Sequence, residues 1–83
     1  MSKHFLTVLQ AQTKREHNVV VSVALNGADL SGLDLAGIMF VDVDFSGVNF
    51  SKTKLQGCSF FNCILDHADF SQADLSYTLL NNQ

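Results

Sequence analysis

Between Val23 and Asn82, a large apolar residue stands at every fifth position. The chain has Leu or Phe there twelve times in succession, at Leu25, Leu30, Leu35, Phe40, Phe45, Phe50, Leu55, Phe60, Leu65, Phe70, Leu75 and Leu80. Since Leu and Phe make up about a fifth of the chain, twelve matches in one frame have odds of roughly one in 10^8. A period of five fits neither a helix nor a flat strand, so each pentapeptide is predicted to be its own structural unit.

A second column of the repeat is also small or apolar. It lies two positions before each central Leu or Phe and consists of Val23, Ala28, Leu33, Ile38, Val43, Val48, Thr53, Cys58, Cys63, Ala68, Ala73 and Thr78. Two such columns in every unit predict two side chains that point into a shared interior.

The remaining columns of the repeat are mostly polar or glycine. Five of the seven aspartates directly precede a central Leu or Phe, and serines commonly follow it. All five glycines fall two positions after a centre, at Gly27, Gly32, Gly37, Gly47 and Gly57. Glycine adopts positive φ without steric cost, so each unit is predicted to be a short straight edge that ends in a corner.

The repeats of the pentapeptide-repeat family resemble three segments of this chain, GADLSGLDLAG, VDFSGVNFSKTKLQG and HADFSQADLS. The resemblance covers residues 23–82 and implies an all-β solenoid, a right-handed quadrilateral β-helix of about three coils with four pentapeptides per coil. It also implies that the two apolar columns fill the interior. The lack of proline in the sequence agrees, because stacked coils pair through their backbone amides.

Residues 1–22 are predicted to form an N-terminal capping segment, and residues 23–83 the repeat domain. The spacing of Phe5, Val8 and Leu9 predicts a short helix with one apolar face. A hairpin made by residues 5–12 and 19–23 is the alternative, because Val, Thr and Phe favour strands. In either arrangement, residues 19–23 are expected to lead into the solenoid as a strand.

The size and apolar content of the chain suit one small domain of 83 residues. No apolar run approaches the roughly 18 residues of a membrane span or the core of a signal peptide, so we expect a cytoplasmic protein that binds no membrane. Cys58 and Cys63 stand in the inward minus-two column, which predicts buried, reduced thiols. A disulfide, or a metal site that also uses His67, is the alternative.

Enzyme motifs are missing from the sequence, which has no glycine-rich phosphate loop, no HExxH and no nucleophile elbow. We therefore expect no catalysis, no cofactor and no metal. Direct binding of nucleic acid is not expected either, because the five basic residues are scattered and the largest surface is acidic.

Side chains twenty residues apart are expected to stack in one column of the solenoid. Three of its faces are then polar and acidic, and we predict a partner-binding surface made by Asp29, Asp34, Asp44, Asp69 and Asp74. The fourth face is apolar, and we predict an interface made by Met39, Val41, Phe61 and Leu79. The N-terminal segment, a second subunit and a target protein are the alternatives for what covers it.

Charge suggests a function for the acidic faces. From Val23 onward, seven aspartates stand against two lysines, a net charge of −5, whereas the first 22 residues net +2. The resemblance implies a DNA mimic, since the family is best known for acidic rods that occupy the DNA-binding surface of gyrase, a topoisomerase. This rod is short, so a narrower channel in a nuclease or a CRISPR effector is a further expected target, as for small phage-type inhibitors. The alternative is a plain interaction scaffold, or a fragment of a secreted effector, whose aspartates only solvate the repeat.

The expected partner is therefore a protein that handles nucleic acid. The last coil ends close to the apolar Leu79, and members of the family often pair through this end, so the resemblance also implies a homodimer.

Overall fold

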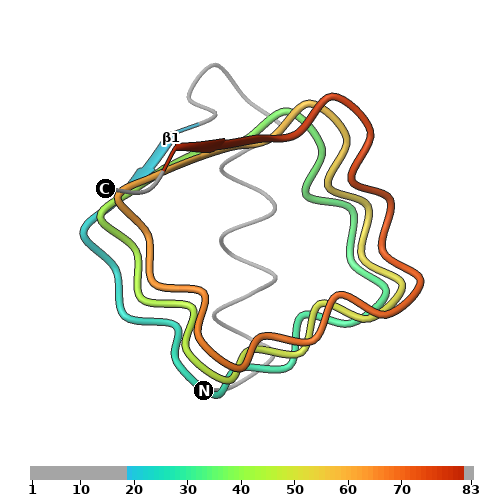
Figure 1. Ribbon diagram of the computed structural model, residues 1–83, viewed down its shortest axis with the longest axis horizontal. Coiled ribbons are helices and arrows are strands. Elements are labelled where there is room, and N and C mark those ends of the chain that lie inside the picture. Colours follow the sequence, from blue (N-terminus) through green and yellow to red (C-terminus); the bar gives the residue numbers. More distant parts are fainter. Residues whose placement is uncertain (1–18, 82–83) are drawn as a thin grey trace.

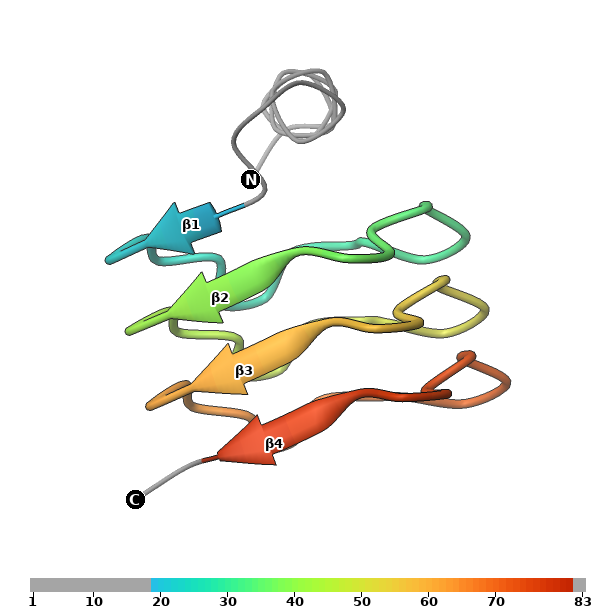
Figure 2. The ribbon, with the colours of Figure 1, turned by 90° about the horizontal axis from the view of Figure 1, so that it is seen from above.

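The computed structural model describes residues 19–81, which form a β-helix of stacked coils (Figure 1). Four short strands, β1 (Val19–Val21), β2 (Met39–Val41), β3 (Ser59–Phe61) and β4 (Leu79–Asn81), make one parallel sheet in the order β1-β2-β3-β4. Figure 2 shows them side by side and running in the same direction. The predicted all-β solenoid is confirmed. The strand predicted over residues 19–23 is present but ends at Val21. The predicted helix or hairpin falls mainly on residues 1–18, outside the described residues.

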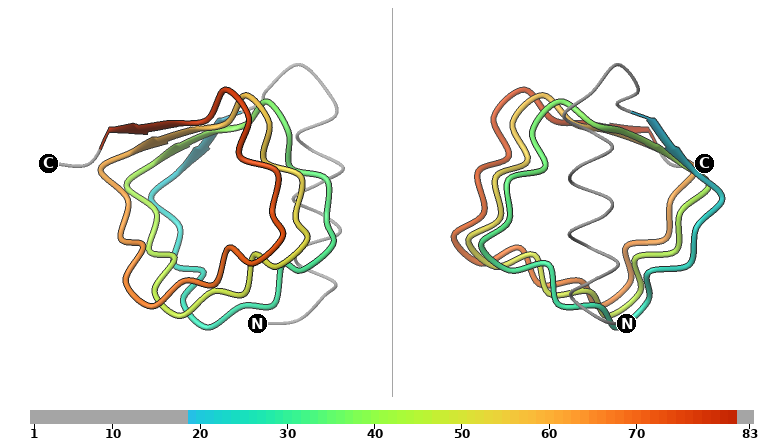
Figure 3. Two further views of the ribbon diagram at one scale, coloured as in Figure 1. Left: turned by 45° about the vertical axis from the view of Figure 1, so that its right-hand side comes forward. Right: turned by 180° about the vertical axis from the view of Figure 1, so that it is seen from behind.

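Each coil contains twenty residues, or four pentapeptides. The register of the sheet pairs Val20 with Phe40, Phe40 with Phe60, and Phe60 with Leu80. The oblique view and the view from behind in Figure 3 show that successive coils follow almost the same four-sided outline. Residues twenty apart therefore stack, as the repeat predicts.

Backbone pairing joins the coils on the other three faces too. Single parallel bridges connect Asp29 with Asn49 and Asn49 with Asp69, and similar bridges run through Asp44 and Lys54. On one of these faces the N–H of Phe50 donates to the carbonyl of Asp69 at 2.7 Å. These bonds satisfy buried amides on every side of the coil, as a solenoid interior requires.

The corners between faces have positive φ at the position two residues after each centre. Gly47 is an example, with φ of 66°, and the N–H of Val48 donates to the carbonyl of Phe45 at 3.0 Å to close the turn. A turn with positive φ only at its third residue is of type II, which favours glycine there. The chain also places other residues at this position with φ between 55° and 61°, namely Ser22, Asp42, Lys52, Asn62, His67, Gln72 and Tyr77. The fold thus imposes the corner even where the sequence lacks glycine.

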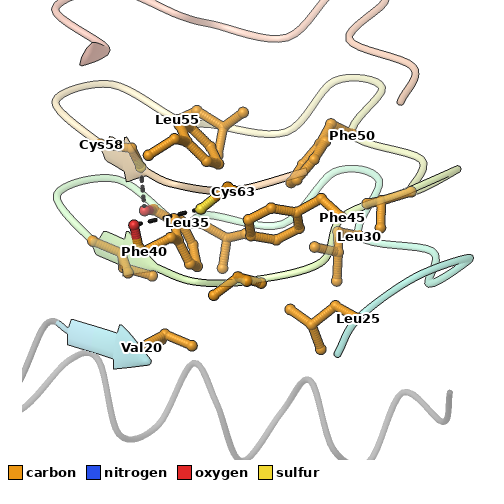
Figure 4. Packing of buried hydrophobic residues seen from close by; sticks show 14 of the residues in the cluster. Val20, Leu25, Leu30, Leu35, Phe40, Phe45, Phe50, Leu55, Cys58 and Cys63 are labelled. Carbon is orange, nitrogen blue, oxygen red and sulfur yellow. Dashed lines mark hydrogen bonds between the residues drawn. The ribbon is translucent and has the colours of Figure 1, made fainter. Parts of the chain in front are cut away.

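The interior is a column of stacked Leu and Phe side chains (Figure 4). The central residues from Leu25 to Phe60 are all between 0% and 1% exposed. Two pairs of rings twenty residues apart stack nearly parallel: Phe40 on Phe60, with centroids 5.1 Å apart, and Phe50 on Phe70, 4.9 Å apart. These separations are close to the spacing of about 4.8 Å between paired strands, so backbone pairing and ring stacking reinforce each other.

Polar atoms of the minus-two column are satisfied inside the core. Thr53 Oγ1 donates to the carbonyl of Leu30 at 2.8 Å, and Cys58 Sγ to that of Leu35 at 2.9 Å. Cys63 Sγ lies 3.5 Å from the carbonyl oxygen of Phe40 and makes the equivalent bond (Figure 4). Both cysteines are free and buried, and burial raises the pKa of each thiol. They act as small core residues with a weak donor, which agrees with the prediction of buried, reduced thiols.

The last coil is less covered than the others. Leu65 and Phe70 are only half buried, while Leu75 is 41% and Leu80 61% exposed. Within residues 19–81 no further coil packs against this end of the core. The same central position therefore contributes very different amounts of buried area along the chain.

We predict that Phe50→Ala lowers the free energy of unfolding by about 3 to 5 kcal/mol, because the lost ring leaves a cavity between stacked coils. Chemical denaturation monitored by circular dichroism measures the change. Leu80→Ala is the control at an exposed centre, and it should cost less than about 1 kcal/mol. Equal losses in the two variants would contradict the burial described above.

Candidate partner-binding surfaces

The predicted acidic residues lie on three faces of the β-helix and not on one. Asp29 and Asp69 share a column with Asn49 between them, and Asp34 and Asp74 share another with Lys54 between them. Asp44 lies in a third column. Four of the aspartates thus form two pairs. The two members of a pair lie in the same column but two coils apart, and a residue that is not acidic stands between them.

Each of these aspartates also stabilises the backbone beside it. The carboxylate of Asp74 accepts a hydrogen bond from the N–H of Ser76 at 3.0 Å and another from its hydroxyl at 2.6 Å. Asp29, Asp44 and Asp69 make the same pair of bonds with the serine two residues on, and Asp34 accepts from the N–H of Ala36. This is an Asx turn, in which a side chain takes the place of a backbone acceptor at the start of a corner. The repeat pattern predicts only the outward position of these aspartates. Their role in the turns was missed, although the recurrent Asp-x-Ser spacing indicates it.

The Asx turns change the acidity of three carboxyl groups. The hydroxyl of Ser46, and then its backbone N–H, lower the pKa of Asp44 below its usual 3.8. The pKa values of Asp69 and Asp74 are lowered in the same way by Ser71 and Ser76. Hydrogen bonds to a carboxylate favour its charged form, so these groups are ionised at neutral pH.

The turn itself needs an acceptor oxygen but not a negative charge. Asn49 stands where its neighbours in the column have Asp, and its Oδ1 accepts from the N–H of Ser51 at 2.9 Å. The charge of the aspartates is therefore separable from their structural role.

The predicted apolar residues lie on the outer face of the sheet. Their strands alternate, so that the central Phe40 and Phe60 are buried and the residues on either side face outward. Met39 is 40% and Leu79 60% exposed, while Val41 and Phe61 are half buried. Val19 and Val21 of β1, 50% and 52% exposed, extend this surface by one coil. These two valines were not among the residues predicted for the apolar interface. Val20 falls at a central position of the repeat, and this places its two neighbours on the outside.

Comparison with known families then identifies the repeat. The family model described as pentapeptide repeats (8 copies) matches residues 24–60 and 53–82, more than half of the chain. The chain belongs to the pentapeptide-repeat family. A comparison with curated proteins found no match.

Pentapeptide-repeat proteins are typically protein-interaction modules and are generally non-enzymatic. Over residues 19–81 of this member, no group of three or more His, Cys, Asp and Glu side chains is placed to hold a metal ion. The same part of the chain contains no helix long and apolar enough to cross a membrane. The surfaces that remain to be explained are the acidic columns and the apolar sheet face.

The lowered pKa values predict that the protein loses stability in acid. A carboxyl group whose pKa is depressed by folding stabilises the native state above its unfolded pKa, and this contribution disappears as pH falls through the folded value. We therefore expect the melting temperature to be constant between about pH 5 and pH 7 and to decrease below about pH 4.

The control for this experiment is the triple variant Asp44→Asn, Asp69→Asn and Asp74→Asn. It keeps the acceptor oxygens, as Asn49 does, but has no charge to lose at these sites. Its melting temperature should change less with acidification than that of the parent. An identical pH dependence would show that these Asx turns do not link folding to protonation.

Proposed function

We propose that this pentapeptide-repeat protein is a non-enzymatic DNA mimic, which binds the nucleic-acid-binding surface of another protein through its acidic faces. The observation that carries the proposal is that exposed carboxylates such as those of Asp69 and Asp74, whose pKa values are lowered by their serine partners, stand at positions set by the Asx turns and the coil register. The partner is a protein with a basic channel for nucleic acid, such as a topoisomerase, a nuclease or a CRISPR effector.

Charge and length support a short mimic. Four strands spaced by about 4.8 Å span roughly 14 Å, over which duplex DNA carries about eight phosphate charges. Residues 19–81 carry seven aspartates and two lysines, a net charge of −5, over this length. The protein thus offers a little more than half of the charge density of DNA on a scaffold that needs no ordering upon binding.

The second candidate function is a plain interaction scaffold, and the Asx turns favour it. Each aspartate of the acidic columns has a structural reason to be present, and Lys54 interrupts the column of Asp34 and Asp74. In this alternative the aspartates hold the corners and solvate the repeat, and binding uses other surfaces.

We predict that replacing Asp29, Asp34, Asp69 and Asp74 together with Asn preserves the fold and weakens binding by more than about tenfold, because the acceptors remain and four charges are lost. The measurement is competition with a labelled DNA duplex for a gyrase, a nuclease and a CRISPR effector, at low and high salt. For the parent, competition should weaken as salt is raised.

Lys54→Asn is the control, and it should change the binding affinity in the opposite direction, because it removes the positive charge between Asp34 and Asp74. A mimic should bind more tightly after this change. If the fourfold Asn variant competes as well as the parent, charge mimicry is excluded and the scaffold function is favoured.

We also propose that two copies of the protein pair through the last coil. Leu79 and Leu80, at 60% and 61% exposure, present apolar area at this end, and a two-fold pairing would cover it and double the length of the acidic rod. Light scattering coupled to size exclusion should give the mass of a dimer, and Leu80→Lys should return the mass of one chain. A single-chain mass up to about 1 mM, where even weak complexes form, would exclude the dimer.

A further inference from the structure

The outer face of the sheet carries an inference that is independent of the acidic faces. Its outward residues form two rows that run across the strands. One row is Val19, Met39, Ser59 and Leu79, and the other is Val21, Val41, Phe61 and Asn81. Four of the six apolar members are at least 40% exposed, namely Val19, Val21, Met39 and Leu79. A fifth, Phe61, contributes a half-buried aromatic ring.

We propose that this face binds an amphipathic α-helix of a partner protein, which has basic residues along one flank. The helix lies across the strands, between the two rows of side chains. Three properties of the face support this occupant: its dimensions, its area and the charge beside it.

The dimensions match one helix. Three-residue strands are about 10 Å long, and a helix with its side chains is about 10 to 12 Å wide. Four paired strands span roughly 14 Å, which is the length of about ten helical residues. One helical turn rises about 5.4 Å, close to the spacing of about 4.8 Å between coils, so successive turns meet successive strands.

The area argues against a second copy of the sheet as the occupant. The flat extent of the face is roughly 140 Å², whereas each partner in a standard stable interface buries about 800 Å². Two sheets packed face to face would therefore form too small a contact. A single helix makes a contact of this size, which suits a weak and transient complex and not a stable dimer.

The charge beside the face determines which flank of the bound helix is basic. Asp42 directly follows Val41 at the corner next to the second row, and its Oδ1 accepts from Asn62 Nδ2 at 2.6 Å. The exposed carboxylate is thus held at this edge. At the opposite edge the corners are Gly37, Gly57 and Tyr77, none of which is an acidic residue. A lysine or arginine on the flank nearer Asp42 completes the match.

The test uses synthetic peptides as probes. The first is an amphipathic peptide of about fourteen residues, long enough to keep ten helical when its ends fray, with Leu at helical spacing and Lys on one flank. The second has Glu in place of Lys, and the third is a scrambled sequence of the first. Fluorescence anisotropy of the labelled peptides with the full chain measures binding, and the Lys peptide should bind at least about tenfold more tightly than the other two.

Two matched pairs of protein variants locate the site. Phe61→Asn should weaken binding of the Lys peptide about tenfold or more, whereas Leu75→Asn, on another face, should not. Asp42→Asn keeps the acceptor for Asn62 and should weaken binding and its salt dependence. Asp66→Asn, an exposed position on the neighbouring face that is not part of the acidic surface, should leave both unchanged. Melting curves check that each variant is folded.

Crosslinking keeps the proposal testable if Phe61→Asn does not fold. A peptide that carries a photoreactive benzophenone in its apolar stripe should attach to outward residues of β1 to β4 in the parent protein, such as Met39 and Phe61. Attachment at Leu75 or Leu80, equal binding of the scrambled peptide, or equal effects of Asp42→Asn and Asp66→Asn would each overturn the proposal. None of these results depends on whether the acidic faces mimic DNA.

Discussion

Backbone pairing between coils of equal length is the constraint on which the rest of this structure depends. The N–H and carbonyl groups of one coil find partners in the next only if each coil returns after twenty residues. The spacing of paired strands then brings equivalent side chains to about 4.8 Å, which suits stacked rings such as Phe50 and Phe70. The buried interior, the hydrogen bonds of its polar atoms and the columns of side chains on the surface all follow from this register.

The aspartates connect the stability of the fold with its surface chemistry. Through the Asx turns, carboxylates such as that of Asp74 hold the corners and are themselves held in place. A group fixed in this way loses little conformational entropy when a partner binds it, which favours recognition by charge. Asn49 shows that the turn and the charge are separate, so the number of acidic positions can change without loss of the fold.

The sheet face differs from the other faces because apolar side chains fill most of its outward positions. Val, Met, Phe and Leu there favour extended backbone, and this is where the chain forms strands of three residues and not single bridges. The result is a flat apolar strip beside faces that are polar and acidic. A molecule with both kinds of surface can contact two parts of a partner, or two partners, at once.

The sequence by itself determined the fold, because the interval of five residues between central Leu and Phe is a local pattern that repetition makes unmistakable. It also determined the corners at Gly27, Gly32, Gly37, Gly47 and Gly57 and the outward position of Asp and Ser. Only the tertiary structure decided that Lys52 and Tyr77 adopt the same positive φ as glycine, because the pairing of neighbouring coils outweighs their own preference. It alone decided that Val19 and Val21 extend the apolar face, and that Leu80 is exposed while Phe60 of the same column is buried, because burial depends on which coils lie on either side.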